Sequence, residues 1–166
     1  MENDSRPESF RLLFVCSGNT CRSPLARALA ECEVEARGWQ VKVRSAGVSA
    51  LSGGPASEGS LRVAARHGLD LGGHRSRPVD EELVRWADLI LVMSPTHLLR
   101  LAELGAAGKA ALLDAFARGE EGGQEEPGAG VPDPFGGDDQ EYEETYLTLE
   151  DLIPKALRRL ELILAP

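Results

Sequence analysis

Residues 15–24 read Val15-Cys16-Ser17-Gly18-Asn19-Thr20-Cys21-Arg22-Ser23-Pro24. The apolar run 11–15 leading into them is rich in strand-forming residues, and apolar residues recur at helical spacing after them. This pattern predicts a buried strand over 11–15, a loop, and a helix over 24–37 with Ser23 as N-cap and Pro24 as first helical residue. The free N–H groups of such a loop converge with the positive end of the helix dipole, which favours a bound anion.

The residue types within this loop predict a phosphate site with a nucleophile at its base. Gly18 and Asn19 tolerate the left-handed backbone that turns successive N–H groups inward. The planar fork of Arg22 matches two phosphoryl oxygens. A cysteine is a good nucleophile as the thiolate and not as the neutral thiol. The helix N-terminus and the guanidinium both favour the thiolate at Cys16. An inert buried thiol is the alternative for Cys16, and the matching register of Gly18, Asn19 and Arg22 disfavours it.

Two motifs together resemble the low-molecular-weight protein phosphatase family over about residues 11–164. They are Cys16-x5-Arg22 followed by Ser23-Pro24, and Asp133-Pro134-Phe135 late in the chain. The resemblance implies a phosphoprotein phosphatase that acts through a cysteinyl-phosphate intermediate, without a cofactor or metal. Cys16, Arg22 and Asp133 are its implied catalytic residues, with Asp133 as general acid. Taken alone, an aspartate before proline is more readily a turn residue. The implied phosphate-binding loop comprises Ser17, Gly18, Asn19, Thr20, Cys21 and Ser23.

The same resemblance implies a network that supports the loop. In this family a loop asparagine is held by a serine and a histidine, here Asn19 with Ser45 and His74, and the Ser23 hydroxyl donates to the Cys16 thiolate. An ordinary loop histidine is the alternative for His74. Cys21 lies five residues from Cys16 in a curled loop, so we expect the two sulfurs to approach each other and form a reversible disulfide. Cys32, on the predicted helix, is expected in the core.

Three positions bear on which phosphorylated side chain is the substrate. Tyrosine phosphatases of this family usually carry isoleucine at the position of Thr20 and tyrosine at that of Phe135. The combination of Thr20 with Asp133-Pro134-Phe135-Gly136-Gly137 resembles the bacterial protein-arginine phosphatase branch. A guanidinium suits a hydroxyl and a carboxylate, whereas a phenyl ring suits isoleucine. Leu51, where many tyrosine enzymes have an aromatic wall, points the same way. Phosphoarginine is therefore favoured over phosphotyrosine, and Thr20 as a mere β-branched replacement for isoleucine is the alternative.

Two further classes share part of the pattern and are disfavoured. A thioredoxin-coupled arsenate reductase needs additional cysteines near the third strand, and none follows Cys32. A non-catalytic phosphate-binding module would not need Cys16, Arg22 and Asp133 together. A metal site is not expected, because the sequence has no Cys-x2-Cys motif and no paired histidines.

The rest of the chain predicts strands that alternate with helices. Such alternation indicates an α/β three-layer sandwich, with a four-stranded parallel sheet, helices on both faces and the ligand at the carboxyl ends of the strands. Its last helix carries a buried face from Tyr142 to Leu164. Beyond the elements already given, we expect strands over 39–44, 88–93 and 109–113, helices over 56–67, 80–86, 95–104 and 139–164, and a mobile loop over 119–130.

Length and composition fit one globular phosphatase domain over 11–166, preceded by a flexible lead-in over 1–10. The net charge of −9 argues against a nucleic-acid partner, so an anionic substrate must be captured by a local positive site. No apolar run approaches a membrane span and the start is no secretory signal. Three cysteines, an odd number, favour the reducing cytoplasm. The expected partner is a phosphorylated protein, and the oligomeric state is left open.

Overall fold

The computed structural model describes residues 9–119 and 130–164, and a four-stranded parallel sheet lies at its centre. The strand order is β2-β1-β3-β4, and all three pairings are parallel. Helices cover both faces, so the expected three-layer α/β sandwich is confirmed. The strands are β1 (Phe10–Cys16), β2 (Val41–Gly47), β3 (Leu89–Val92) and β4 (Ala110–Leu112).

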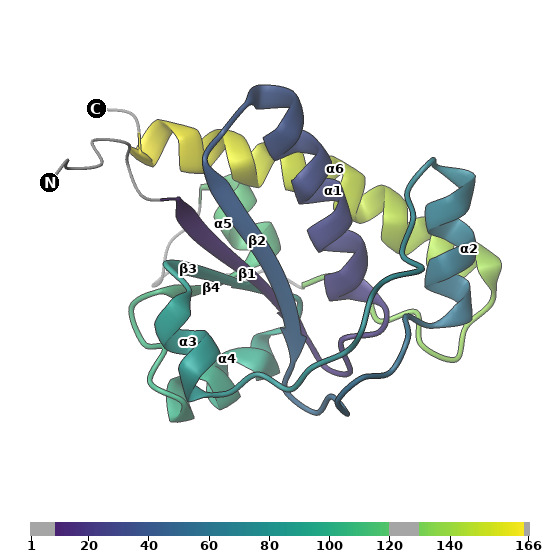
Figure 1. Cartoon of the computed structure of the whole chain (residues 1–166), viewed down its shortest axis with the longest axis horizontal. Helices are drawn as coiled ribbons and strands as arrows, with labels where there is room; N and C mark the ends of the chain where they lie inside the picture. The colour runs from purple at the N-terminus through teal and green to yellow at the C-terminus, as the bar shows by residue number, and fades with distance from the viewer. Residues whose placement is uncertain (1–8, 120–129, 165–166) are drawn as a thin grey trace, which may run out of the picture.

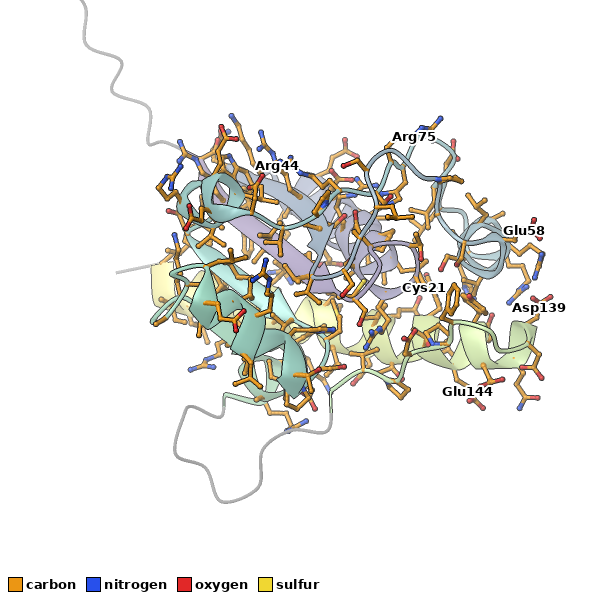
Figure 2. The ribbon with its side chains drawn as sticks, turned by 90° about the horizontal axis from the view of Figure 1, so that it is seen from below. Cys21, Arg44, Glu58, Arg75, Asp139 and Glu144 are labelled. Atoms are coloured by element: carbon orange, nitrogen blue, oxygen red, sulfur yellow. The ribbon has the colours of Figure 1, made fainter. Side chains whose placement is uncertain are left out.

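Six helices surround this sheet within the described residues. Figure 1 shows α1, α5 and α6 against one face and α3 and α4 against the other, while α2 packs beside α6 at one end. Figure 2 shows Glu58 and Asp139 close to each other at this α2–α6 end of the molecule. The bounds are α1 (Arg22–Arg37), α2 (Glu58–Arg66), α3 (Glu81–Trp86), α4 (Pro95–Glu103), α5 (Leu113–Arg118) and α6 (Asp139–Leu164).

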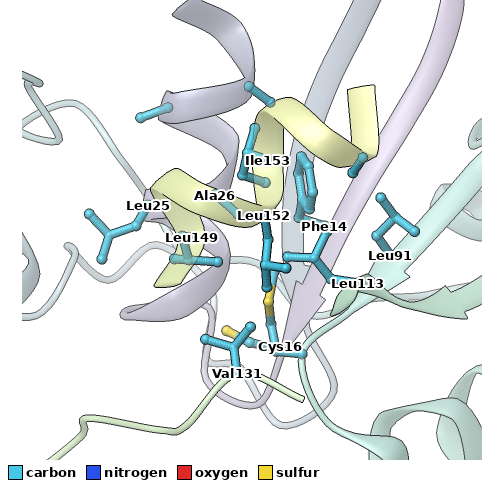
Figure 3. Close-up of a cluster of buried hydrophobic side chains, with 14 of the residues drawn as sticks. Phe14, Cys16, Leu25, Ala26, Leu91, Leu113, Val131, Leu149, Leu152 and Ile153 are labelled. Carbon is cyan, nitrogen blue, oxygen red and sulfur yellow. The ribbon is translucent and has the colours of Figure 1, made fainter. Parts of the chain in front are cut away.

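Strand β1 divides the apolar core into two halves because alternate side chains of a strand face opposite ways. Leu12, Phe14 and Cys16 face α1, α5 and α6, whereas Leu13 and Val15 face α3 and α4. All five side chains are buried. Figure 3 shows the first half, with Cys16 at the margin of a cluster that also holds leucines of α6. The core therefore fixes the end of β1, from which the predicted phosphate loop begins.

The start of α1 differs from the prediction. The helix begins at Arg22 with Cys21 as N-cap, so Ser23 is not the cap and Pro24 is the third helical residue. Proline is tolerated there because the first N–H groups of a helix have no intrahelical partner. The Ser23 hydroxyl instead contacts Cys16 and Asn19, and this contact removes it from capping.

Strand β2 also differs, spanning 41–47 in place of 39–44. Trp39 belongs to the turn that ends α1, where its N–H donates to Val34 O next to the left-handed Gly38. At the other end, residues 45–47 continue pairing with β1.

Two smaller expectations were wrong as well, and one helix was missed. Helix α5 was not expected, because six residues are too few to show a period. Leu164 is exposed at the end of α6, and Cys32 is exposed on α1. The other elements lie within two residues of the predicted bounds. Expectations for residues 1–8 and 120–129 lie outside the described residues, and no described helix is both long and apolar enough to cross a bilayer.

Candidate active site

The loop between β1 and α1 lies at the carboxyl end of the sheet, next to the end of β2. Gly47, the last residue of β2, lies directly against it: Val48 N–H donates to Cys16 O at 3.0 Å and Ser49 N–H to Ser17 O at 2.9 Å. A Cβ at Gly47 would overlap Ser17 O and lie 2.8 Å from Asn19 N. Glycine at this position therefore allows the loop to pack against the strand end.

Asn19 is held at the centre of the loop in a left-handed conformation, with φ of 58°. Its side chain is fully buried, and its amide donates to Ser23 Oγ at 2.8 Å and to Ser45 Oγ at 3.0 Å. Its Oδ1 accepts from Arg77 N–H at 2.9 Å, and its backbone oxygen accepts from His74 Nε2 at 2.7 Å. The structure thus brings together the predicted asparagine, serine and histidine. The bonds offset the cost of the uncommon backbone conformation.

Burial lowers the pKa of His74, so its ring is neutral at physiological pH. Nε2 must then carry the hydrogen, because the oxygen of Asn19 can only accept. The histidine is a fixed donor rather than an acid or base exposed to the site.

Cys16 lies at the base of the loop with its thiol buried. Its Sγ is 2.9 Å from Ser23 Oγ. Since Asn19 already donates to that oxygen, the single hydrogen of Ser23 is free to point at the sulfur, and the longer 3.4 Å contact with Ala46 O is the weaker alternative. The structure thus places a hydroxyl donor on the sulfur of the predicted nucleophile.

Arg22 is buried and its terminal nitrogens are fully engaged. NH1 donates to Ser94 Oγ at 2.9 Å and to Val131 O at 3.0 Å. NH2 donates to Ser17 Oγ at 3.3 Å and lies 3.5 Å from Asp133 Oδ2. Nε is buried and has no hydrogen-bond partner among the described residues. An orphaned N–H beside a pocket is what a site for an anion requires.

Asp133 lies in the segment before α6 and is half exposed. Its Oδ1 accepts from Phe135 N–H at 3.1 Å, which fixes the turn, while Oδ2 faces Arg22. The predicted acid and the predicted clamp, 111 positions apart in sequence, are therefore neighbours. Phe135 is 73% exposed beside them.

Cys16, Arg22 and Asp133 line one pocket of about 230 Å³. Among the described residues no cluster of three or more metal-ligating side chains occurs. Leu51 does not line the pocket and is 83% exposed, so its assignment to substrate selection stays a prediction. The lining comprises Cys16, Ser17, Gly18, Thr20, Cys21, Arg22, Ser49, Asp133 and Phe135.

A wider groove of about 640 Å³ lies elsewhere, between α1 and the edge strand β2. It is open to solvent, and charged side chains of both signs line it, among them Arg27, Glu31 and Lys42. Cys32 and Arg27 also line it, but Arg27 is paired with Glu31. Cys16, Arg22 and Asp133 meet in the smaller pocket, which is therefore the candidate active site.

The second loop cysteine has partners of its own. Cys21 Sγ contacts Ser57 Oγ at 3.2 Å and Tyr142 Oη at 3.4 Å. Burial raises the pKa of Tyr142 to about 12, so its phenol stays protonated. Cys16 and Cys21 are both free thiols, and the expected disulfide stays a prediction.

Sequence reasoning missed two residues next to Arg22. Neither Ser94 nor His97 was predicted as a site residue. Ser94 Oγ accepts from Arg22, and His97 Nε2 lies 3.0 Å from Ser17 Oγ. Burial first, and then Arg22, lowers the pKa of His97 to about 4. The Ser94-x-x-His97 spacing directly after a buried strand was the available indication, because such a strand ends at the ligand edge of the sheet.

Comparison with known proteins agrees with this geometry. A family model described as low molecular weight phosphotyrosine protein phosphatase matches residues 11–162. The protein-arginine-phosphatase of Bacillus subtilis is 37% identical over 152 residues, covering 90% of this chain and 96% of that protein. The low molecular weight protein-tyrosine-phosphatase Etp of Escherichia coli is 34% identical over 151 residues, covering 90% and 93%.

A solved structure of similar fold also bears on the chemistry. It is a YwlE arginine phosphatase mutant with a phosphorylated active site serine, and it superimposes with a TM-score of 0.83 at 35% identity. The match covers 92% of this chain and 96% of that one.

Proposed function

Because the chain belongs to the low molecular weight phosphotyrosine protein phosphatase family, we propose that it removes the phosphoryl group from phosphoarginine side chains of proteins through a cysteinyl-phosphate on Cys16. The observation that carries the choice of substrate is Thr20, which lines the pocket where the tyrosine branch of the family usually has isoleucine. The relatives named protein-arginine-phosphatase support the same choice.

In the first step the Cys16 thiolate attacks phosphorus. The S–P bond forms as the P–N bond breaks, and the leaving nitrogen takes a proton from Asp133. The orphaned Nε of Arg22 and the N–H groups of the loop bind the phosphoryl oxygens and stabilise the charge that develops on them. Asp133 is suited to this role because it reaches the pocket while remaining half exposed.

In the second step Asp133, now a carboxylate, takes a proton from water. The water oxygen attacks phosphorus, the S–P bond breaks, and inorganic phosphate leaves with Cys16 restored as a thiolate. The Ser23 hydroxyl stabilises that thiolate as a leaving group, since it lies 2.9 Å from the sulfur.

Phosphoarginine fits the chemistry of the pocket rim. Among the residues that the structure describes, the hydroxyl of Thr20 makes only a long contact, 3.8 Å, with Cys21 Sγ. It is therefore available to a polar side chain above the loop. The substrate's guanidino group offers N–H donors to that oxygen and to Asp133. Phe135 offers an exposed ring on which a planar guanidino group can stack.

Phosphotyrosine is the second candidate. The same exposed Phe135 ring can pack against a phenyl ring, and the E. coli relative is named a tyrosine phosphatase. What separates the two candidates is position 20, which carries a hydroxyl in this chain.

Partner and location follow as parts of the proposal. The substrate is a phosphorylated protein, and its phosphoryl group binds the local positive site of Arg22 despite a net charge of −9. We expect no nucleic-acid or membrane partner. The three free cysteines favour the reducing cytoplasm.

Turnover of matched peptides tests the substrate choice. One peptide sequence is prepared with phosphoarginine and, at the same position, with phosphotyrosine, and kcat/KM is measured for both. We expect the phosphoarginine peptide to be preferred by tenfold or more, on the order of 1.4 kcal/mol in transition-state binding. A preference for phosphotyrosine would make the chain a tyrosine phosphatase, and turnover of neither would refute the phosphatase proposal.

A further inference from the structure

The two terminal nitrogens of Arg22 belong to a hydrogen-bonded ring of four residues, Arg22, Ser94, His97 and Ser17. From Arg22, NH1 donates to Ser94 Oγ at 2.9 Å and NH2 to Ser17 Oγ at 3.3 Å. His97 joins these two serines, because its Nδ1 is 3.1 Å from Ser94 N and its Nε2 is 3.0 Å from Ser17 Oγ. The histidine is buried and takes no part in the two catalytic steps described above.

The ring fixes the tautomer of the histidine. The backbone N–H of Ser94 can only donate, so Nδ1 of His97 must be the acceptor. A neutral imidazole then carries its hydrogen on Nε2 and donates it to Ser17. Ser17 Oγ consequently accepts two N–H bonds, one from the histidine and one from Arg22.

We propose that His97 is a positioning residue for Arg22, acting through Ser17 and Ser94. It donates to the Ser17 hydroxyl and accepts from the backbone N–H of Ser94, so it fixes the two residues whose hydroxyls accept from the terminal nitrogens of Arg22. This orients the remaining Nε toward the phosphoryl group. This inference rests on the proposed function, since Arg22 is taken to bind phosphate. The Nε–H donor is effective only when it is aimed at the accepting oxygen, so freedom of rotation of the guanidinium lowers both affinity and rate.

Two substitutions at His97 separate its two bonds. In His97→Asn, Oδ1 lies where Nδ1 was and still accepts from Ser94 N–H, but the shorter side chain does not reach Ser17. In His97→Gln, the longer amide reaches Ser17 and can donate to it. Thr96→Asn, at the exposed neighbouring position of α4, is the matched control for an added asparagine.

The readouts are the dissociation constant of inorganic phosphate and kcat for an aryl phosphate. We expect His97→Asn to weaken phosphate binding by about three- to tenfold and to lower kcat by about tenfold. His97→Gln should recover part of both losses, and Thr96→Asn should match the wild type. If His97→Asn folds and binds phosphate like the wild type, the proposal is overturned.

Combination with Ser17→Ala tests the route of the effect. Once the Ser17 hydroxyl is absent, His97→Asn should change phosphate affinity by less than about twofold. An equal loss in both backgrounds would show that the histidine acts through general stability, contradicting the proposal. Failure of the wild type itself to bind phosphate or turn over substrate would instead refute the proposed function.

A measurement on the unaltered protein keeps the inference testable if the variants do not fold. Nitrogen-15 NMR of the wild-type chain, which has three histidines, should show His97 neutral at pH 6 with its hydrogen on Nε2. A hydrogen on Nδ1, or a charged ring at that pH, would contradict the hydrogen-bonded ring.

Discussion

Asp133 combines two tasks at the scale of a single residue, and they can be separated. Its Oδ1 accepts from Phe135 N–H and shapes the turn, while the carboxyl group supplies the proton. Asp133→Asn keeps the acceptor and removes the acid, whereas Asp133→Ala removes both. We expect both variants to lower kcat by about 10²–10⁴-fold on a poor leaving group and far less on an activated aryl phosphate. Steady-state rates on both substrates check this.

If Asp133→Asn retained wild-type rates on the poor leaving group while Asp133→Ala did not, the residue would only shape the turn. Equal losses on both leaving groups would likewise exclude proton donation.

Thr20 is the residue at which substrate choice is expected to be decided. Thr20→Ile removes a hydroxyl and adds apolar surface worth about 1–2 kcal/mol to an aromatic ring. A guanidino group left unpaired against isoleucine loses about 1–3 kcal/mol more. The ratio of kcat/KM values should therefore shift towards phosphotyrosine by about two orders of magnitude, measured on the matched peptides. An unchanged ratio would mean that position 20 does not select the substrate.

Because His97 is buried and neutral, we expect the free energy of unfolding to depend on pH. Its pKa falls from 6.5 in the unfolded chain to about 4 in the folded one, with Arg22 and Asp133 as its charged neighbours. Between these values the unfolded state binds a proton that the folded state does not. The free energy of unfolding therefore falls as pH drops from about 6.5 to 4, by on the order of 3 kcal/mol, and is unaffected by this group above that window.

Urea unfolding of the wild type and His97→Asn at several pH values checks this. The difference in stability between them should shrink as pH falls through the window. Parallel curves would show that His97 is not the group that titrates.

At the scale of an element, the loop between β1 and α1 has one cysteine at each end, Cys16 at the end of β1 and Cys21 before α1. Mild peroxide should oxidise Cys16 to a sulfenic acid, and attack by the Cys21 thiol would then form a disulfide and release water. Inactivation should be reversible by a thiol reductant, with the Cys16–Cys21 disulfide found by mass spectrometry. In Cys21→Ser, the same exposure should leave a larger irreversible fraction.

Cys21 must leave Ser57 and Tyr142 to make that bond, so Tyr142→Phe is a useful companion variant. Equal recovery of the wild type and Cys21→Ser would show that Cys21 does not protect the nucleophile.

Elements with a clear apolar pattern could be predicted from the sequence. A short helix, and a residue with two possible roles, could not. The apolar period of α6 gave its bounds, and buried β1 and β3 were evident from continuous apolar runs. Helix α5 has too few residues to show a period. The sequence suggested two roles for Ser23, as the N-cap of the helix and as a hydrogen-bond donor to Cys16. In the folded protein its hydroxyl contacts the Cys16 sulfur.

The candidate site also has residues that the sequence predicts and residues that it does not. Cys16, Arg22 and the Asn19 network follow from a motif whose spacing is local or known for the family. The role of His97 depends on Ser17, 80 positions away in the chain, and no local pattern encodes that contact.

For the whole molecule, the parallel sheet explains why distant residues converge. The carboxyl ends of β1, β2 and β3 lie at one edge, so the loops that follow them meet there. The last residues of β1 and β2 are Cys16 and Gly47, the turn after β3 supplies Ser94, and the segment before α6 adds Asp133. The alternation of strands and helices predicted this edge. The side-chain packing that closes the pocket could not be predicted without the structure.

One competition experiment tests the central claim most directly. A phosphoarginine peptide with an oxygen-18-labelled phosphoryl group and an unlabelled phosphotyrosine peptide of the same sequence are mixed in equal amounts with the wild-type protein. The reaction is quenched within one turnover, and the Cys16 peptide is weighed by mass spectrometry. We predict a phosphoryl group on Cys16 that carries mostly oxygen-18. An unlabelled phosphoryl group on Cys16, or none on it while phosphate is released, would contradict the account.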